Sequence, residues 1–245
     1  MASELHTWIE VAAFMGGGIA MGFGAIGAAI GEGHTAASAN AVMMRNPAIK
    51  GDIFKTMLVG QAVAESASIF ALVIAILLLF TRFHEVSYMP VAALLGAGIS
   101  MGFGAMGSGV GSGFPSATAC EGIARQPEAT QKVTTAMLAG QAVAQTPAIL
   151  ALLVSIILIF KEFPASDTIL LAPAAALISS GICMGIGAIG PGIGEGIAAS
   201  GGVTWVARNQ EYAGQIIRLM LVGMAVSEST AIYSLVVSLL LIFVV

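Results

Sequence analysis

Two glutamates, Glu65 and Glu228, stand near the centres of long apolar segments, and each is preceded by another acid, Glu32 or Glu195, in the segment before it. A charge at mid-depth in a bilayer costs roughly 2.5–3.5 kcal/mol on insertion scales, so an acid there marks a functional site. Gln145 occupies the place where a third central acid would stand. The pattern predicts an ion carrier with fewer carrying groups than its repeats would allow.

The composition is that of an integral membrane protein. Of the 245 residues, 58% are hydrophobic and 9% are charged, whereas soluble domains carry about 25% charged residues. The mean hydropathy is +0.96. Six apolar segments each exceed the roughly 20 residues that cross a bilayer, so we predict an all-α membrane protein with six transmembrane helices. We expect it to be surrounded by lipid and to have no nucleic-acid partner. These segments cover residues 11–43, 54–81, 89–121, 133–161, 170–206 and 216–245.

The basic residues are divided unequally between the ends of these segments. Arg82 and Lys161 flank the second and fourth connections. Short loops rich in Lys and Arg stay in the cytoplasm. We therefore expect a protein of the cell (inner) membrane whose hairpin loops lie in the cytoplasm and whose two termini lie on the outer side. The bases that flank the first, third and fifth connections are Arg45, Lys50, Lys55, Arg125, Lys132, Arg208 and Arg218.

The chain contains three copies of one helical hairpin. Corresponding positions are 80 residues apart between the first and second copies and 83 apart between the second and third. The hairpins are expected to cover residues 1–85, 86–167 and 168–245. The aligned first halves are MGFGAIGAAIGEG from Met21, MGFGAMGSGVGSG from Met101 and MGIGAIGPGIGEG from Met184.

The two helices of each hairpin differ in composition. The first is rich in glycine, and the second is rich in Leu, Ile, Val and Phe. Small residues let helix backbones approach closely within lipid, so we expect the first helices to form a tight inner layer and the second helices an outer, lipid-facing one. Three inner helices enclose little space, so several copies of the chain are expected to close a ring through a head-to-tail interface. The same packing explains the Gly-x-Gly-x-x-Gly string at Gly22, which follows no strand.

Each pair of acids can meet across its hairpin. Glu195 lies 13 residues before the turn residue Arg208 and Glu228 lies 20 residues after it, and the first hairpin repeats both counts with Glu32 and Glu65. At 1.5 Å per residue, the two acids of a pair reach similar depths. Two carboxylates in a low dielectric cannot both be ionised without a partner. A shared proton or a bound cation is therefore expected between them.

Oxygen ligands accompany the acid in the second helix of the third hairpin. The hydroxyls of Ser229, Thr230 and Tyr233 lie within two helical turns of Glu228. Hard cations bind oxygen ligands, and a proton alone would not need this set, so the set favours sodium. The alternative is that the Ser and Thr hydroxyls bond back to their own helix and help helices to pack.

These features together resemble the proteolipid c (or K) subunit of rotary ATP synthases and ATPases, here in triplicate. The resemblance covers essentially the whole chain and rests on the glycine-rich first helix, the Arg-x-Pro turn and the mid-helix acid of the second helix. It implies a non-catalytic, ion-translocating rotor-ring (c-ring) subunit that works against a stator a subunit, with ATP hydrolysis or synthesis on other subunits. Contacts with the central stalk are then expected at the turn arginines Arg45, Arg125 and Arg208.

The resemblance also implies ion ligands in the first and third hairpins. In that family the second-helix acid binds the transported ion, and sodium-binding members add a first-helix Gln or Glu, a valine carbonyl, and Ser, Thr and Tyr of the second helix. Sodium is thus favoured over protons, and no organic cofactor is expected. Ala67 and Phe70 depart from the pattern, and Gln61, one turn before Glu65, is expected to compensate. The matching positions are Glu32, Val63, Glu65 and Ser66 in the first hairpin and Glu195, Val226, Glu228, Ser229, Thr230 and Tyr233 in the third.

The second hairpin departs furthest from this pattern. Ser112 and Gln145 stand where the acids belong, and Thr146 and Pro147 follow. An amide cannot alternate between charged and neutral forms, so this hairpin is expected to move no ion, although Gln145 and Thr146 could lend oxygens to an adjacent site. Pro147 removes a helix hydrogen bond and predicts a kink. We predict two ions per chain, a low ion-to-ATP ratio, and a ring suited to a pump or to a synthase working at high ion-motive force.

The main alternative is a stand-alone oligomeric ion transporter or channel. The repeats are parallel, whereas many such transporters contain inverted repeats. A purely structural proteolipid would leave the paired acids unexplained. Cys120 and Cys183 lie inside apolar segments and predict neither a disulfide framework nor a metal site.

Overall fold

The computed structural model describes residues 2–81, 87–164 and 170–244, and within these ranges every long element is a helix and no strand occurs. Six helical stretches in these ranges are long and apolar enough to cross a membrane. The all-α expectation is therefore confirmed. The helices are α1 (Ala2–Arg45), α2 (Lys50–Phe80), α3 (Met89–Arg125), α4 (Thr130–Ala144), α5 (Thr146–Phe160), α6 (Leu171–Arg208) and α7 (Ala213–Phe243).

A single non-helical residue and a short 3-10 turn connect the helices of each hairpin. In the first two hairpins this residue precedes a proline, which disfavours the helical conformation, and Asn46 accordingly has φ −135° and ψ 79°. Asn209 adopts nearly the same conformation, φ −135° and ψ 71°, although Gln210 follows it. The turn geometry is therefore common to all three repeats and does not depend on proline.

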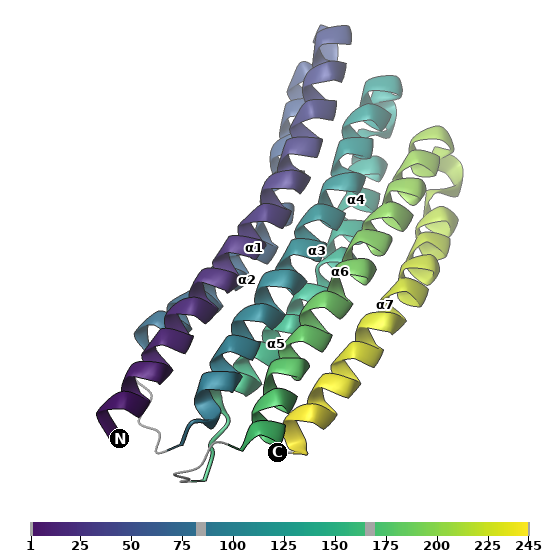
Figure 1. Ribbon diagram of the computed structural model, residues 1–245. Coiled ribbons are helices and arrows are strands. Elements are labelled where there is room, and N and C mark those ends of the chain that lie inside the picture. The colour runs from purple at the N-terminus through teal and green to yellow at the C-terminus, as the bar shows by residue number, and fades with distance from the viewer. Residues whose placement is uncertain (1, 82–86, 165–169, 245) are drawn as a thin grey trace.

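The first helices of the hairpins form one closely packed layer. Figure 1 shows α1, α3 and α6 running side by side, with α2, α4 and α5 behind them. A Cβ atom on Gly31 of α1 would overlap the Gly109 carbonyl oxygen of α3, and one on Gly111 would overlap the Gly192 carbonyl oxygen of α6. Glycine thus allows direct backbone contact between neighbouring helices. This arrangement confirms the expected close packing of the glycine-rich first helices, with α3 between α1 and α6.

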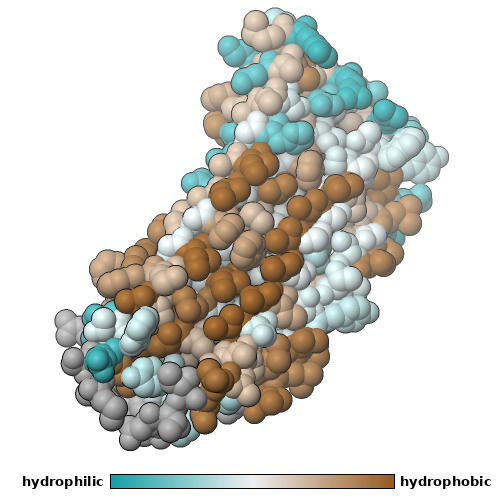
Figure 2. Space-filling view, in the orientation of Figure 1, coloured by the Kyte–Doolittle hydropathy of each residue, from teal (hydrophilic) through white to brown (hydrophobic). Residues whose placement is uncertain are grey.

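The second helices expose large apolar side chains. Leu72 and Ile76 of α2, Leu153 of α5, and Val237 and Leu240 of α7 are all exposed, as expected for surfaces in contact with acyl chains. The glycine-rich face has a hydrophobic middle too, and its hydrophilic residues gather at the end that holds the α1–α2 turn (Figure 2). Both findings agree with a multi-pass membrane protein.

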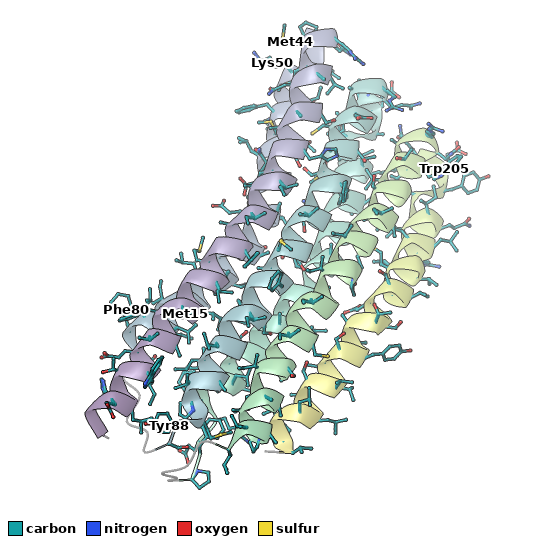
Figure 3. The ribbon with its side chains drawn as sticks, in the orientation of Figure 1. Met15, Met44, Lys50, Phe80, Tyr88 and Trp205 are labelled. Carbon is teal, nitrogen blue, oxygen red and sulfur yellow. The ribbon has the colours of Figure 1, made fainter. Side chains whose placement is uncertain are left out.

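The two ends of the helices carry different side chains. Figure 3 shows Met44 and Lys50 at one end of the molecule and Phe80 and Tyr88 at the other. The turn end carries most of the bases. At the opposite end, Lys161 donates a hydrogen bond to the Ile242 carbonyl oxygen at 3.0 Å. Arg82, the other base expected there, lies outside the described residues.

The second helix of the middle hairpin is interrupted at Gln145. α4 ends at Ala144 and α5 begins at Thr146, with Pro147 in the first turn of α5. The ring nitrogen of Pro147 cannot donate a hydrogen bond and its ring crowds the preceding turn. The Ala148 N–H donates to the Ser108 hydroxyl of α3 at 3.1 Å and not to its own helix. In place of the kink expected at Pro147, the structure has a break in the helix with a hydrogen bond donated to the neighbouring helix α3.

Candidate ion-binding sites

The acids of each predicted pair lie within electrostatic range of one another. Glu32 repels Glu65 across the first hairpin, and Glu195 repels Glu228 across the third. The two acids of each predicted pair are therefore neighbours across their hairpin. Their surroundings differ, because Glu195 is fully buried and Glu228 half-buried, whereas Glu32 is half-buried and Glu65 is exposed.

The carboxylate of Glu195 has no hydrogen-bond partner among the described residues. Both of its oxygens are buried, and neither meets a donor there. A buried charge without a partner is unfavourable by several kcal/mol. Glu195 therefore requires either a proton or a cation at this place.

The Ser and Thr hydroxyls predicted as ligands are all bonded to their own helices. The Ser229 hydroxyl donates to the Val226 carbonyl at 2.7 Å, and the Ser66 hydroxyl donates to the Val63 carbonyl at 2.6 Å. The Thr230 hydroxyl donates to the Ser227 carbonyl at 3.0 Å. The alternative raised by the sequence, bonding within the helix, is thus what the structure contains. The oxygens keep lone pairs, because a hydroxyl has two acceptor positions besides its proton.

Two predicted ligands of the third hairpin lie on its open side. Val226 is 69% exposed and Tyr233 is 66% exposed. In the described residues, no three His, Cys, Asp or Glu side chains form a group that could hold a metal ion. A cation at either acid pair would therefore need carbonyl or hydroxyl oxygens as further ligands.

Gln61 contacts the first helix of its own hairpin. Its amide nitrogen donates to the Glu32 backbone carbonyl at 3.1 Å. Gln61 was expected to replace the ligands that Ala67 and Phe70 cannot supply. Because its nitrogen is bonded to Glu32, only its amide oxygen could act as that ligand. The observed bond holds α2 to α1 at the level of the acids.

The middle hairpin contains two glutamine amides that donate hydrogen bonds to the first hairpin. The Gln145 amide nitrogen donates to the Val63 carbonyl of the first hairpin at 3.0 Å and to the Ser112 hydroxyl at 2.8 Å. Sequence reasoning missed Gln141, which is fully buried and donates to the carbonyls of Gly60 and Ser112, both at 2.9 Å. Its signal was available, because Gln141 corresponds to Gln61 in the repeat. The amide oxygens of Gln141 and Gln145 have no partner among the described residues.

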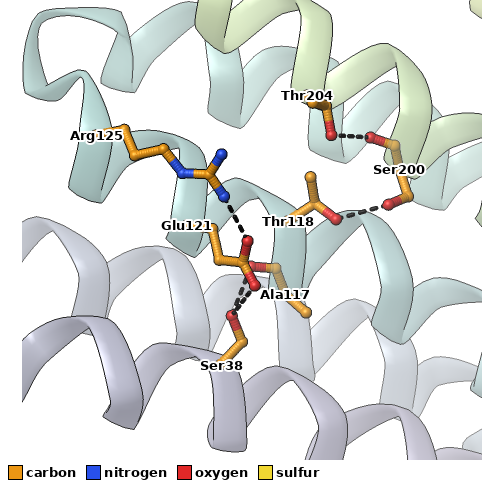
Figure 4. Close-up of polar contacts among 7 residues, drawn as sticks. All are labelled: Ser38, Ala117, Thr118, Glu121, Arg125, Ser200 and Thr204. Carbon is orange, nitrogen blue, oxygen red and sulfur yellow. Dashed lines mark hydrogen bonds and ion pairs between the residues drawn. The ribbon is translucent and has the colours of Figure 1, made fainter.

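The turn arginines have different surroundings in the three hairpins. Arg125 pairs with Glu121 at 2.7 Å, and Glu121 also accepts a hydrogen bond from Ser38 at 3.3 Å (Figure 4). Arg208 lies over the Trp205 ring, 5.4 Å from its centroid. Arg45 is exposed. The three turn arginines therefore differ in the contacts that already hold their side chains.

Comparison with known proteins agrees with the three hairpins. The family of ATP synthase C subunits matches the chain three times, over residues 15–78, 95–158 and 178–241. The chain is 52% identical over 68 residues to the ATP synthase c subunit of Petrotoga mobilis, covering 28% of this chain and 71% of that protein. It is 53% identical over 70 residues to the ATP synthase c subunit of Alkaliphilus oremlandii, covering 29% and 78% respectively.

A third relative, the ATP synthase c subunit of Prochlorococcus marinus, is 47% identical over 70 residues, which cover 29% of this chain and 86% of the relative. Each relative thus corresponds to about one third of the chain. Because the family matches all three hairpins, this chain belongs to the family of ATP synthase C subunits, which are non-catalytic, ion-carrying membrane proteins.

Proposed function

We propose that the chain is a rotor-ring subunit that carries two cations, one at Glu65 and one at Glu228, with Na⁺ preferred over H⁺. The observation that carries the proposal is the buried Glu195 carboxylate beside Glu228, which has no donor among the described residues. A proton or a cation removes that cost. The middle hairpin has no acid at either position, so it carries no ion.

The preference for Na⁺ rests on the oxygens around the acids. The Ser229 and Thr230 hydroxyls direct their protons at helix carbonyls, which leaves their lone pairs available to a hard cation. Together with the carboxylates of an acid pair, such hydroxyls offer more oxygen ligands than proton binding requires. In the first hairpin, Ser66 has the same arrangement.

The open edges of the chain support closure of a ring by further copies. On α1, Cβ atoms placed on Gly18 and Gly22 would meet nothing within 4 Å. Their repeat equivalents on α3, Gly98 and Gly102, pack against α1 backbone. By the same repeat, the free face of α6 in one copy fits the free face of α1 in the next, a head-to-tail contact that closes as a ring.

The repeat also indicates how the site in the first hairpin is completed. Gln145 of the middle hairpin reaches the Val63 carbonyl of the hairpin before it. Val226 is the repeat equivalent of Val63, so Glu65 would face the Val226 carbonyl and the Ser229 hydroxyl of the preceding copy. Glu228 would face the middle hairpin of its own chain. The exposure of Glu65 and Val226 in the single chain is consistent with this arrangement.

In the assembled rotary complex, the ring turns past subunit a of the stator, and each acid exchanges its ion there. The hairpin loops, with Arg45 and Arg208 as the freer turn arginines, lie on the cytoplasmic side and contact the central stalk, and both termini lie outside. Nucleotide chemistry occurs on other subunits. Two ions per three hairpins lower the ion-to-ATP ratio, so the same ATP free energy moves each ion against a steeper gradient. This ratio suits an ATP-driven pump or a synthase at high ion-motive force.

Labelling with a hydrophobic carbodiimide, which modifies protonated carboxyls, tests the proposal in the purified ring. We expect at most two labels per chain, on Glu65 and Glu228, and protection of both by Na⁺ at fixed pH. Glu65→Gln and Glu228→Gln should each remove one label. Labelling that is indifferent to Na⁺ would establish protons as the cargo, and labelling of neither acid would refute ion carriage at these positions.

A further inference from the structure

The amide of Gln145 lies between oxygen atoms of two hairpins. Its nitrogen donates to the Val63 carbonyl at 3.0 Å and to the Ser112 hydroxyl at 2.8 Å. The carbonyl oxygen is an acceptor without a proton, so the nitrogen of the amide, and not its oxygen, must face it. Carbonyl and hydroxyl oxygens are also the ligands that hard cations take. The amide N–H groups therefore supply positive charge density at a place where oxygens converge.

The repeat brings the same place into the third hairpin with different residues. Ser112 corresponds to Glu195, and Gln145 corresponds to Glu228. There the buried Glu195 oxygens meet no donor among the described residues. One interface thus contains its own hydrogen-bond donor, and the equivalent position in the third hairpin has none within the described part of the chain.

We propose that the Gln145 amide is a built-in substitute for the transported cation at the interface between the first and middle hairpins. This inference rests on the proposed function, since it takes the acids of the other hairpins as the ion carriers. The amide satisfies the Val63 carbonyl and the Ser112 hydroxyl permanently. The interface therefore stays closed and neutral as it passes the stator, with nothing to release and nothing to bind.

Features found in the middle hairpin hold the amide in this position. Gln141, one turn earlier, bridges the Gly60 and Ser112 carbonyls and so ties the same two hairpins together. The helix break at Gln145 leaves the Ala148 N–H directed at the Ser108 hydroxyl. The repeat has Ala28 and Pro191 in place of Ser108, so the other hairpins have no hydroxyl there. The middle hairpin is thus built around the break that positions Gln145.

Gln145→Glu in the complete reconstituted ATPase tests the inference. The change removes the donor and adds a carboxylate among the Val63 carbonyl and the Ser112 hydroxyl, so a third Na⁺ should bind. We expect carbodiimide labels to rise from two to three per chain, with the new label protected by Na⁺. The matched control is Gln131→Glu, the same chemical change at an exposed position of α4, whose carboxyl should show no protection by Na⁺.

Stability of the ring gives a second measurement. We expect the Gln145→Glu ring to assemble or resist heat in detergent only when Na⁺ is present, because the ion then replaces the amide. Gln145→Leu should weaken the ring at every Na⁺ concentration, since neither a donor nor a carboxylate is left. A Gln145→Glu ring that gains no protected label, or that fails to assemble even in high Na⁺, would overturn the inference. The proposed function is tested separately by the two protected labels of the unmodified ring.

Discussion

The middle and third hairpins place chemically different groups at the same point of the same fold. In the middle hairpin an amide donates two hydrogen bonds, and its first-helix partner is the hydroxyl of Ser112. In the third hairpin two carboxylates face each other, and Glu195 is buried without a donor among the described residues. The middle hairpin therefore supplies a hydrogen-bond donor at this point, whereas the buried acid of the third hairpin needs a proton or a cation.

The first hairpin differs from the third in the exposure of its acids. Both hairpins contain an acid pair at the same spacing. Both pack against the middle hairpin, but Glu195 of the third is buried whereas Glu65 of the first is exposed. In the proposed ring, the neighbouring copy encloses Glu65. The following changes test these contrasts.

The largest effect is expected from Glu228→Gln, which makes the third hairpin resemble the middle one. An amide there cannot release a proton or bind Na⁺ by charge, and the middle hairpin beside it cannot do so either. We expect ATP-driven Na⁺ uptake by proteoliposomes to fall more than about tenfold, equivalent to ~1.4 kcal/mol on the transport barrier. Glu228→Asp, which keeps the charge, is the control and should retain part of the flux. Uptake within about twofold of the unmodified enzyme would contradict ion carriage by Glu228.

Gly111→Ala should separate the inner helices. The new Cβ would overlap the Gly192 carbonyl oxygen of α6, and overpacking costs about 1–3 kcal/mol or more. Thermal unfolding of the chain in detergent measures the loss. Gly51→Ala is the matched control, because nothing lies within 4 Å of a Cβ there, and it should be neutral or slightly stabilising. Equal stability of the two variants would show that the backbone contacts of the inner layer are unimportant.

Gly22→Ala distinguishes the single chain from the ring. A Cβ at Gly22 meets nothing within 4 Å, but at the equivalent Gly102 it would lie 2.7 Å from the Ile19 carbonyl oxygen. The isolated chain should therefore keep its unfolding temperature, while the fraction of chains assembled as rings falls. The expected loss in the free energy of association is about 1–3 kcal/mol per contact. Size measurement in mild detergent separates rings from single chains. Normal ring assembly would show that this face of α1 is not the contact between copies.

Gln141→Met tests the amide bridge with the residue that the third hairpin uses, Met224. The change removes the donor to the buried carbonyls of Gly60 and Ser112. Each lost hydrogen bond costs about 0.5–1.5 kcal/mol, which should appear as a lower unfolding temperature without a change in ion labelling. An unchanged unfolding temperature would mean that the bridge contributes nothing between the hairpins.

Glu121→Gln should have the smallest effect. The pair with Arg125 is formed by side chains that are 45% and 59% exposed, and exposed ion pairs contribute about 0.2–1 kcal/mol. A shift within this range, and weaker at high salt, is expected in thermal unfolding. A larger loss would mean that the contacts of Glu121 at Ser38 hold the first two hairpins together.

Much of the fold followed from the sequence, because the repeats, the glycine-rich first helices and the spacing of the acids about each turn are all properties along the chain. Counting residues from Arg208 placed Glu195 and Glu228 together, and the structure agrees. The turn of the third hairpin was less obvious, because Gln210 stands where the other hairpins have proline. Its geometry is nevertheless shared by the three copies.

The contacts between hairpins could not be predicted in the same way. Spacing gives the depth of a residue but not the rotation of its helix relative to the next hairpin. For this reason the contact of the Gln145 amide nitrogen with the Val63 carbonyl could not be predicted. Likewise, the bond from Ser229 to its own helix depends on a side-chain rotamer, which the sequence does not specify.

The most direct test of the central claim is a count of the Na⁺ ions bound per chain at saturation, by equilibrium dialysis of the purified ring with radioactive sodium. We expect two ions per chain, lost one at a time in Glu65→Gln and Glu228→Gln. Three ions per chain would show that the middle hairpin also binds the cation, and no saturable binding would show that Na⁺ is not the ion these acids carry.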